Sequence, residues 1–118
     1  MSTILITFDG SPETVDEDAR DLRGHLDQDD ELRGRVGGRL LPAQPGTQGT
    51  MAEAVEIAQA LGPVAAPLIS AWVTARLRRG PASITVRRAD GAQVTVSGKN
   101  AAETAELIEQ AERLLTEE

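Results

Sequence analysis

The chain has 118 residues and a formal net charge of −7, with 12 Lys and Arg residues against 19 Asp and Glu residues. This length fits one domain spanning residues 1–118, and a hydrophobic content of 40% is too high for a disordered chain. Cysteine is absent, which excludes disulfides, thiolate catalysis and cysteine-ligated metals. The acidic charge argues against general nucleic-acid binding, because phosphates would be repelled over most of the surface.

The N-terminal residues indicate a cytoplasmic protein. Met1 to Ile4 contain no basic residue ahead of an apolar run, so they lack the pattern of a signal peptide. Phe8 and Trp72 are the only aromatic residues, and we therefore expect no aromatic platform for stacking nucleobases or sugars.

The first two predicted elements are a strand and an amphipathic helix. Residues 3–8 alternate in polarity, with Ile4, Ile6 and Phe8 on one face, which predicts a strand. Ser11 followed by Pro12 predicts a helix start, because serine caps the first N–H groups and proline fits the first helical position. The helix carries apolar residues at steps of three and four: Val15, Ala19, Leu22 and Leu26.

A second, weaker strand is predicted over residues 35–41. Gly37 and Gly38 at its centre indicate a bulge or a strand at the edge of the sheet. Residues 42–49 contain several prolines and glycines, which predicts a loop.

A long helix is predicted from Thr50 to Arg79, with an interruption at Gly62 and Pro63. Thr50 and Glu53 have the spacing of a capping box, in which each side chain accepts a hydrogen bond from the other's backbone N–H. We expect the first part to bury Met51, Ala54, Val55, Ala58 and Leu61. The continuation carries apolar residues at helical spacing: Val64, Leu68, Ala71, Trp72 and Ala75.

The last part of the chain predicts a hairpin and a helix. Residues 83–88 and 93–97 alternate in polarity and are joined through Asp90-Gly91, a strong hairpin signal. Asn100 and Glu103 resemble a second capping box. The helix that follows has the apolar stripe Leu107, Ile108, Ala111, Leu114 and Leu115.

The predicted order β-α-β-α-β-β-α indicates an α+β fold, a two-layer sandwich. The β-α-β start favours two parallel strands joined by a right-handed crossover. The hairpin adds two antiparallel strands, so we expect a mixed four-stranded sheet. The alternating strands predict helices on one face of the sheet and water on the other.

The sequence predicts no catalytic residue, no metal site and no cofactor. His25 is the only histidine and has no evident nucleophile or orienting partner, so we interpret it as a solvated surface residue. An acidic run follows it: Asp27, Asp29, Asp30 and Glu31. A calcium loop that began at Asp27 would have Leu32 and Gly38 where glycine and glutamate are required, so this run predicts a solvated corner.

Two segments leave alternatives open. Gly46–Thr50 precedes a predicted helix N-terminus, where anions bind, but Thr50 stands where a phosphate loop has lysine. We interpret it as a connector, with a ligand-binding regulatory domain as the alternative. The apolar run 61–75 is shorter than the roughly 20 residues of a membrane span. We expect a buried helix there, with membrane anchoring through residues 61–77 as the alternative.

The predicted partner-binding residues are five arginines and Trp72. The arginines follow one another at the end of the long helix and on the first hairpin strand: Arg76, Arg78, Arg79, Arg87 and Arg88. If they converge in space, they form a docking patch for an acidic partner; otherwise they form a solvated cationic face. Trp72 is either a core residue or a partly exposed anchor. An open sheet edge, at Gly37-Gly38 or elsewhere, is another place where a partner's strand can add.

Five segments follow the pattern of one known family. They are LRGHL at 22–26, DELRGRV at 30–36, GTMAEA at 49–54, AWVTARL at 71–77, and the hairpin ITV…DG…VTV within 84–96. Together they resemble the effector-associated constant component family of bacterial conflict systems. The resemblance implies a small non-enzymatic adaptor that binds a partner effector, often a peptidase, or an NTPase in a defence system. It carries over no catalytic residues, and self-association is left open.

Overall fold

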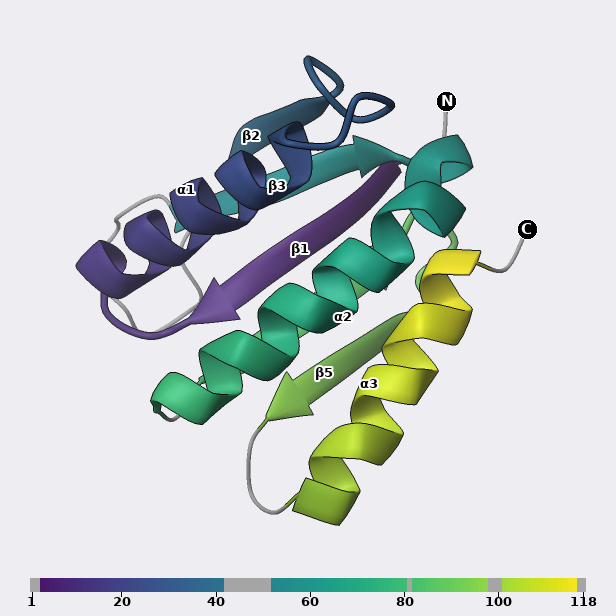
Figure 1. The fold of residues 1–118 in the computed structure, drawn as a ribbon. Helices are drawn as coiled ribbons and strands as arrows, with labels where there is room; N and C mark the ends of the chain where they lie inside the picture. Colours follow the sequence, from purple (N-terminus) through teal and green to yellow (C-terminus); the bar gives the residue numbers. More distant parts are fainter. Residues whose placement is uncertain (1–2, 42–51, 81, 98–100, 117–118) are drawn as a thin grey trace.

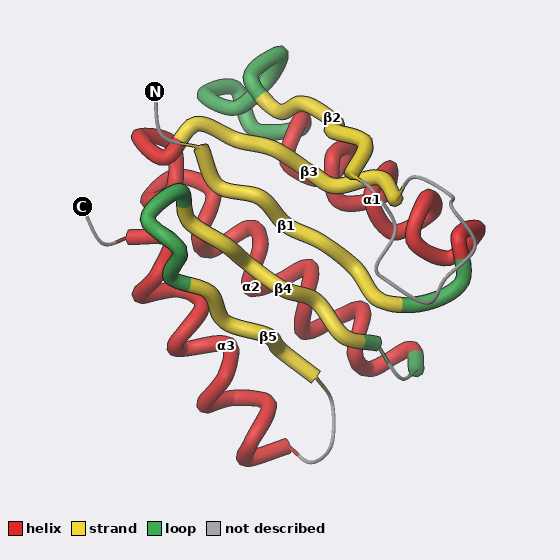
Figure 2. Tube along the Cα trace, turned by 180° about the vertical axis from the view of Figure 1, so that it is seen from behind, coloured by secondary structure: helices red, strands yellow, loops and turns green. Residues whose placement is uncertain are grey.

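The computed structural model describes residues 3–41, 52–80, 82–97 and 101–116. The elements in chain order are β1 (Thr3–Asp9), α1 (Pro12–Asp27), β2 (Val36–Leu41), β3 (Ala52–Ala58), the 3₁₀ turn η1 (Gln59–Leu61), α2 (Gly62–Arg79), β4 (Ser83–Arg88), β5 (Gln93–Ser97) and α3 (Ala101–Thr116). The described strands form one sheet in the order β2-β3-β1-β4-β5. The three described helices cover one face of it (Figure 1), and none crosses the opposite face (Figure 2).

The predicted α+β two-layer sandwich with helices on one face is confirmed. Ser11 caps α1 as expected, since its side chain accepts a hydrogen bond from the Thr14 N–H. The predicted α1 stripe is fully buried: Val15, Ala19, Leu22 and Leu26. In the hairpin, Ile84 lies opposite Val96 and Val86 lies opposite Val94, also as expected.

The helix predicted from Thr50 is wrong in its first part, because Ala52–Ala58 form the strand β3. Val55 and Ile57 lie two residues apart and flank Glu56, which fits a strand as well as the alanines fit a helix. Pairing decides between the two, since Ile57 lies opposite Ile4 and Val55 opposite Ile6 in the core. Thr50 and Met51 lie outside the described residues.

This added strand changes the topology of the sheet. β3 lies between β2 and β1 and is antiparallel to both, so the two strands joined by α1 run parallel, as expected, but are not hydrogen-bonded neighbours. The sheet has five strands, and every neighbouring pair is antiparallel, whereas we expected a mixed sheet of four. β2 is an edge strand, as its glycines indicated, and its pairing with β3 is continuous, without a bulge.

The stripe expected along α2 differs from the one that the helix buries. Of its residues only Trp72 is buried, while Val64 and Leu68 are half-buried and Ala71 and Ala75 are exposed. The helix instead buries Ala65, Ala66, Ile69, Trp72 and Val73. Because α2 is apolar nearly all round, its hydrophobic periodicity does not determine which side faces the sheet.

α3 packs on β5 and α2, and its predicted stripe reaches the core. Ala111, Leu114 and Leu115 are buried, and Leu107 and Ile108 are partly buried against the same cluster. Asn100, the expected cap of this helix, lies outside the described residues.

Candidate partner-binding surfaces

Arg76 holds α1 and α2 together. Its Nε atom donates a hydrogen bond of 2.9 Å to Oδ1 of Asp18, and the two side chains are only 13% and 11% exposed. Asp18 is the single buried charged residue that the structure describes. Both charges are therefore used inside the fold, and Arg76 offers little surface to a partner.

Trp72 is a core residue whose indole nitrogen makes a second bridge to α1. Nε1 donates a hydrogen bond of 2.7 Å to Oδ2 of Asp21, and Nη2 of Arg79 lies 3.7 Å from the same oxygen. The Trp72 ring contacts Phe8 edge-on, with 5.8 Å between ring centroids. Because only 5% of its surface is exposed, Trp72 is a core residue and not a partly exposed anchor.

We expect Trp72→Phe to lower the free energy of unfolding by about 1–2 kcal/mol, because the bond to Asp21 is lost while an aromatic ring is kept. Asp21→Asn is the matched control, since its amide oxygen still accepts the indole N–H and it should cost less. Urea unfolding followed by circular dichroism measures both. Equal stability of Trp72→Phe and the original chain would show that this bond contributes nothing.

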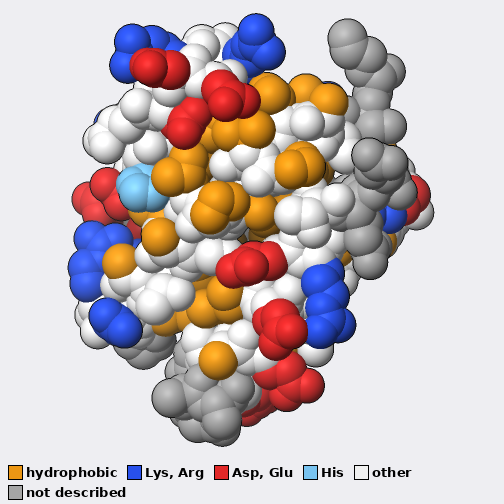
Figure 3. Space-filling model, turned by 45° about the vertical axis from the view of Figure 1, so that its right-hand side comes forward, with side chains coloured by type: hydrophobic (Ala, Val, Ile, Leu, Met, Phe, Trp, Pro, Cys, Tyr) orange, Lys and Arg blue, Asp and Glu red, His pale blue; other side chains and the backbone are white. Residues whose placement is uncertain are grey.

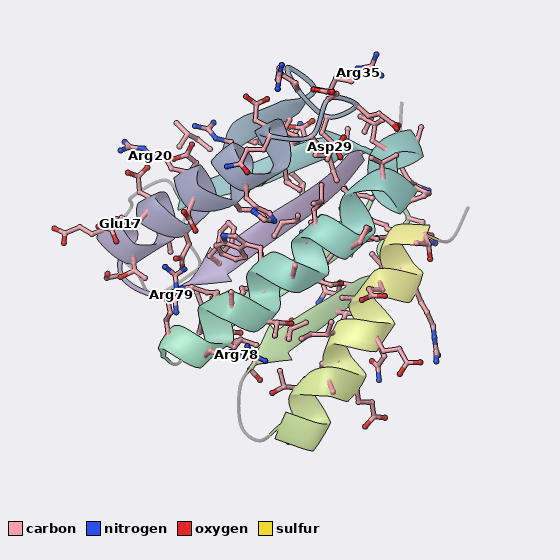
Figure 4. All side chains as sticks on the ribbon, viewed as in Figure 1. Glu17, Arg20, Asp29, Arg35, Arg78 and Arg79 are labelled. Atoms are coloured by element: carbon pink, nitrogen blue, oxygen red, sulfur yellow. The ribbon has the colours of Figure 1, made fainter. Side chains whose placement is uncertain are left out.

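The remaining arginines do not gather into one patch. Arg78 and Arg79 lie at the C-terminal end of α2 (Figure 4), close to where β4 begins at Ser83. β4 then runs away from that end, so Arg87 and Arg88 lie about 15 Å along the strand, at about 3.3 Å per residue. The structure thus separates the predicted cluster into two groups.

Arg87 and Arg88 also point to opposite faces of the sheet. Nε of Arg87 donates to Oε1 of Gln93 at 3.2 Å, next to the Thr85–Thr95 hydroxyl pair on the open face. Arg88 binds Asp90 in the hairpin turn and reaches the Leu114 carbonyl oxygen on α3 at 3.5 Å. The hydrogen bond from Arg88, followed by that from the Ala92 N–H, holds the pKa of Asp90 below its usual value.

The acidic corner after α1 uses its carboxylates to close a turn. Oδ1 of Asp29 accepts a hydrogen bond from the Glu31 N–H, and Oδ1 of Asp27 accepts one from the Gly34 N–H, both at 2.9 Å. Among the described residues, no group of three or more His, Asp or Glu side chains is placed to hold a metal ion. The Gly46–Thr50 loop lies outside the described residues.

His25 is less solvated than we expected. Its side chain is half-buried on α1, and its Nε2 atom is buried without a hydrogen-bond partner among the described residues. No described carboxylate therefore accepts a hydrogen bond from Nε2 of this ring.

The surroundings of Glu53 on β3 raise the pKa of its carboxyl above the usual 4.5. A hydrogen bond with the Asp16 carboxyl is the largest cause and burial the second, while the Arg23 guanidinium, 3.3 Å away, opposes them. Because the folded chain then holds this proton more tightly than the unfolded chain, Glu53 adds stability below its usual pKa. That contribution is lost as pH rises from 4.5 through the raised pKa.

We expect Asp16→Asn to lower the pKa of Glu53, because it removes the neighbouring carboxylate. The free energy of unfolding should then fall less steeply as pH rises above 4.5. Glu17→Gln makes the same charge change on a side chain that points away from the molecule (Figure 4), and should leave Glu53 unaffected. Carboxyl ¹³C NMR titration measures the pKa. An unchanged pKa of Glu53 in Asp16→Asn would contradict this assignment.

The outward face of α2 is apolar. Pro63, Pro67, Ala71 and Ala75 recur every four residues and are exposed. In Figure 3, hydrophobic side chains gather across the upper and middle parts of this side of the molecule, with a few acidic side chains between them. The stretch Gln59–Arg79 is long and apolar enough to cross a membrane by length and composition alone, and one third of its apolar part is buried in the fold.

A shallow groove of about 350 Å³ lies between the hairpin and α3. Its lining residues come from both elements: Ala92, Gln93, Val94, Gln110, Arg113 and Leu114. The groove borders β5, the last described strand at this end of the sheet. Sequence reasoning gave the hairpin and the helix separately and missed the groove, because the packing of α3 on β5 creates it.

Comparison with known proteins gives one match. The family model described as Effector Associated Constant Component 1 matches residues 10–115. No curated protein and no solved structure matches the chain.

Proposed function

Because the chain belongs to the Effector Associated Constant Component 1 family, we propose that it is a non-enzymatic accessory component that binds a partner protein. The partner is an effector, such as a peptidase, or an NTPase of a bacterial conflict or signalling system, and the complex is cytoplasmic. The family match, which covers residues 10–115, is the observation that carries this proposal.

The surfaces of the described residues support a binding role. The fold leaves an open sheet face, an apolar outward face on α2 and a groove beside β5, which together offer flat and grooved contact areas. Three carboxylates, Asp18, Asp27 and Asp29, accept hydrogen bonds that stabilise the fold and the turn after α1. An adaptor needs surfaces of this kind and no reacting groups.

Co-purification from the native host tests the proposal. The tagged chain, expressed at its natural level, should retain the product of a neighbouring gene in a fixed molar ratio, measured by quantitative mass spectrometry. A tagged chain of similar size and charge serves as the control for non-specific capture. Recovery of the tagged chain alone, in conditions that keep both proteins soluble, would contradict an adaptor role.

Membrane association is the second candidate, and the hydropathy of the Gln59–Arg79 stretch favours it. α2 contributes Ile69, Trp72 and Val73 to the core, so leaving the sheet for a bilayer would uncover the core. We therefore expect the chain to stay in the soluble fraction and to remain at the bottom of a liposome flotation gradient. Flotation with the vesicles would favour the membrane candidate instead.

A further inference from the structure

β5 is an edge strand without the usual protection against pairing. Natural sheets guard their edges with charges, prolines or bulges. β2, at the other end of the sheet, carries Arg39 and two glycines. β5 reads Gln-Val-Thr-Val-Ser, has no charge, proline or glycine, and pairs with β4 in continuous register. Such a strand is suited to accept another strand along its free side.

The register shows which backbone groups face outward. The Arg88 N–H donates to the Ala92 carbonyl oxygen at 2.8 Å, so this pair is hydrogen-bonded. Antiparallel pairs alternate, which makes Val94 and Val96 the residues that bond to β4 and turns the N–H and C=O groups of Gln93 and Thr95 outward. The Ser97 carbonyl oxygen, outward by the same rule, accepts a hydrogen bond from the Thr104 hydroxyl on α3 at 3.4 Å.

The groove beside β5 supplies side-chain contacts for an added strand. Val94 from the strand and Leu114 from α3 give it an apolar lining, and Gln110 and Arg113 contribute polar side chains to the same lining. In an added strand, alternate side chains point to the helical side of the sheet, where they enter this groove. Small aliphatic side chains fit there, because the groove is shallow.

The charge of α3 indicates which charge a partner segment should carry next to this helix. Its exposed carboxylates are spread along the helix: Glu103, Glu106, Glu109 and Glu112. The one basic residue, Arg113, pairs with Glu109 at 2.9 Å, so residues 101–116 carry four negative charges and one positive charge. Pairing β5 with a second copy would place two such helices side by side, which like charges oppose.

We propose that β5 and the groove beside it bind an extended segment of a partner protein, with alternating aliphatic side chains and with Lys or Arg next to α3. The segment adds a sixth strand to the five described ones and forms hydrogen bonds with the backbone of Gln93 and Thr95. This inference rests on the proposed adaptor function and names the surface and the class of segment that it uses.

Two variants distinguish the open edge of β5 from its pairing within the fold: Thr95→Pro and Thr95→Val. Proline at 95 removes the outward N–H and keeps the bonds between β4 and β5, since those come from Val94 and Val96. Valine keeps the N–H and removes only the hydroxyl that bonds to Thr85 at 2.9 Å. Circular dichroism melting shows whether both variants fold.

A phage-displayed library of short random peptides, selected on the full chain, is the probe. We expect enriched peptides with alternating Val, Ile or Leu and with Lys or Arg. The best one, as a synthetic peptide in fluorescence anisotropy, should bind Thr95→Pro about tenfold more weakly and Thr95→Val nearly as well as the original chain. Glu106→Arg, on the groove side of α3, should weaken binding more than Glu112→Arg, on the opposite side.

The outcomes distinguish this inference from the adaptor proposal. Equal affinity for folded Thr95→Pro and the original chain, or enrichment of acidic peptides, would overturn the edge assignment. A dimer by light scattering that Thr95→Pro converts to a monomer would assign the edge to a second copy and overturn it too. A native partner that still binds Thr95→Pro would also overturn the edge assignment, but it would leave the adaptor function intact.

Discussion

Gly62→Ala is expected to lower the free energy of unfolding by about 3 kcal/mol, near the upper end of the range for overpacked sites. Gly62 is the buried first residue of α2, where the helix passes against the C-terminal turn of α3. A Cβ atom there would overlap the Leu115 carbonyl oxygen and lie 3.3 Å from Cδ1 of Ile4. The main obstacle is backbone, so one of the two helices must move.

Gly24→Ala is the matched control for this substitution. Gly24 lies within α1, and a Cβ atom built on it meets nothing within 4 Å. Alanine should therefore stabilise the helix by about 0.5–1 kcal/mol through its higher helix propensity. Urea unfolding measures both variants, and a Gly62→Ala chain as stable as the original would mean that α2 and α3 do not approach as closely as described.

Arg76→Met is expected to cost about 3 kcal/mol, because it leaves the Asp18 carboxylate buried without its partner. The double variant Asp18→Leu/Arg76→Met removes both charges and should recover most of the loss, since the desolvation penalty disappears with the pair. A double-mutant cycle from urea unfolding of the four chains gives the coupling between the two residues.

Arg20→Met is the control for that cycle. Arg20 also pairs with an α1 aspartate, Asp16, at 3.0 Å, but the two side chains are 70% and 40% exposed. The same chemical change should therefore shift stability by at most about 0.5 kcal/mol. Similar losses in Arg20→Met and Arg76→Met would contradict the special role of the buried pair.

The elements with a single strong signal could be predicted from the sequence. Ser11-Pro12 and a regular apolar stripe defined α1, and Asp90-Gly91 between two alternating runs defined the β4–β5 hairpin. In each case the local pattern and the tertiary packing favour the same structure. The helical cover on one face of the sheet followed from the alternation in the strands.

β3 could not be predicted, because its sequence fits both periods. Ala-Glu-Ala-Val-Glu-Ile-Ala places Ala54 and Ala58 at helical spacing and Val55 and Ile57 at strand spacing. The strand forms because β1 and β2 leave a place between them where Val55 and Ile57 complete the core. That error also produced the expected mixed sheet, since β3 separates the parallel strands β1 and β2 and is antiparallel to both.

The candidate surfaces depend on tertiary geometry that no local pattern contains. Arg79 and Arg87 lie eight residues apart in sequence, yet the direction of β4 carries them to different ends of the sheet. The partners of Arg76 and Trp72 on α1 are more than fifty residues away. The free side of β5 becomes visible only once the strand order is known.

Reconstitution with the product of the neighbouring gene tests the adaptor account most directly. Light scattering of the co-purified proteins after size-exclusion chromatography should give the mass of a complex in a fixed ratio. Thr95→Pro should release the partner while the chain stays folded. If the chain elutes alone beside a folded, soluble neighbour at concentrations well above those in the cell, the account is wrong.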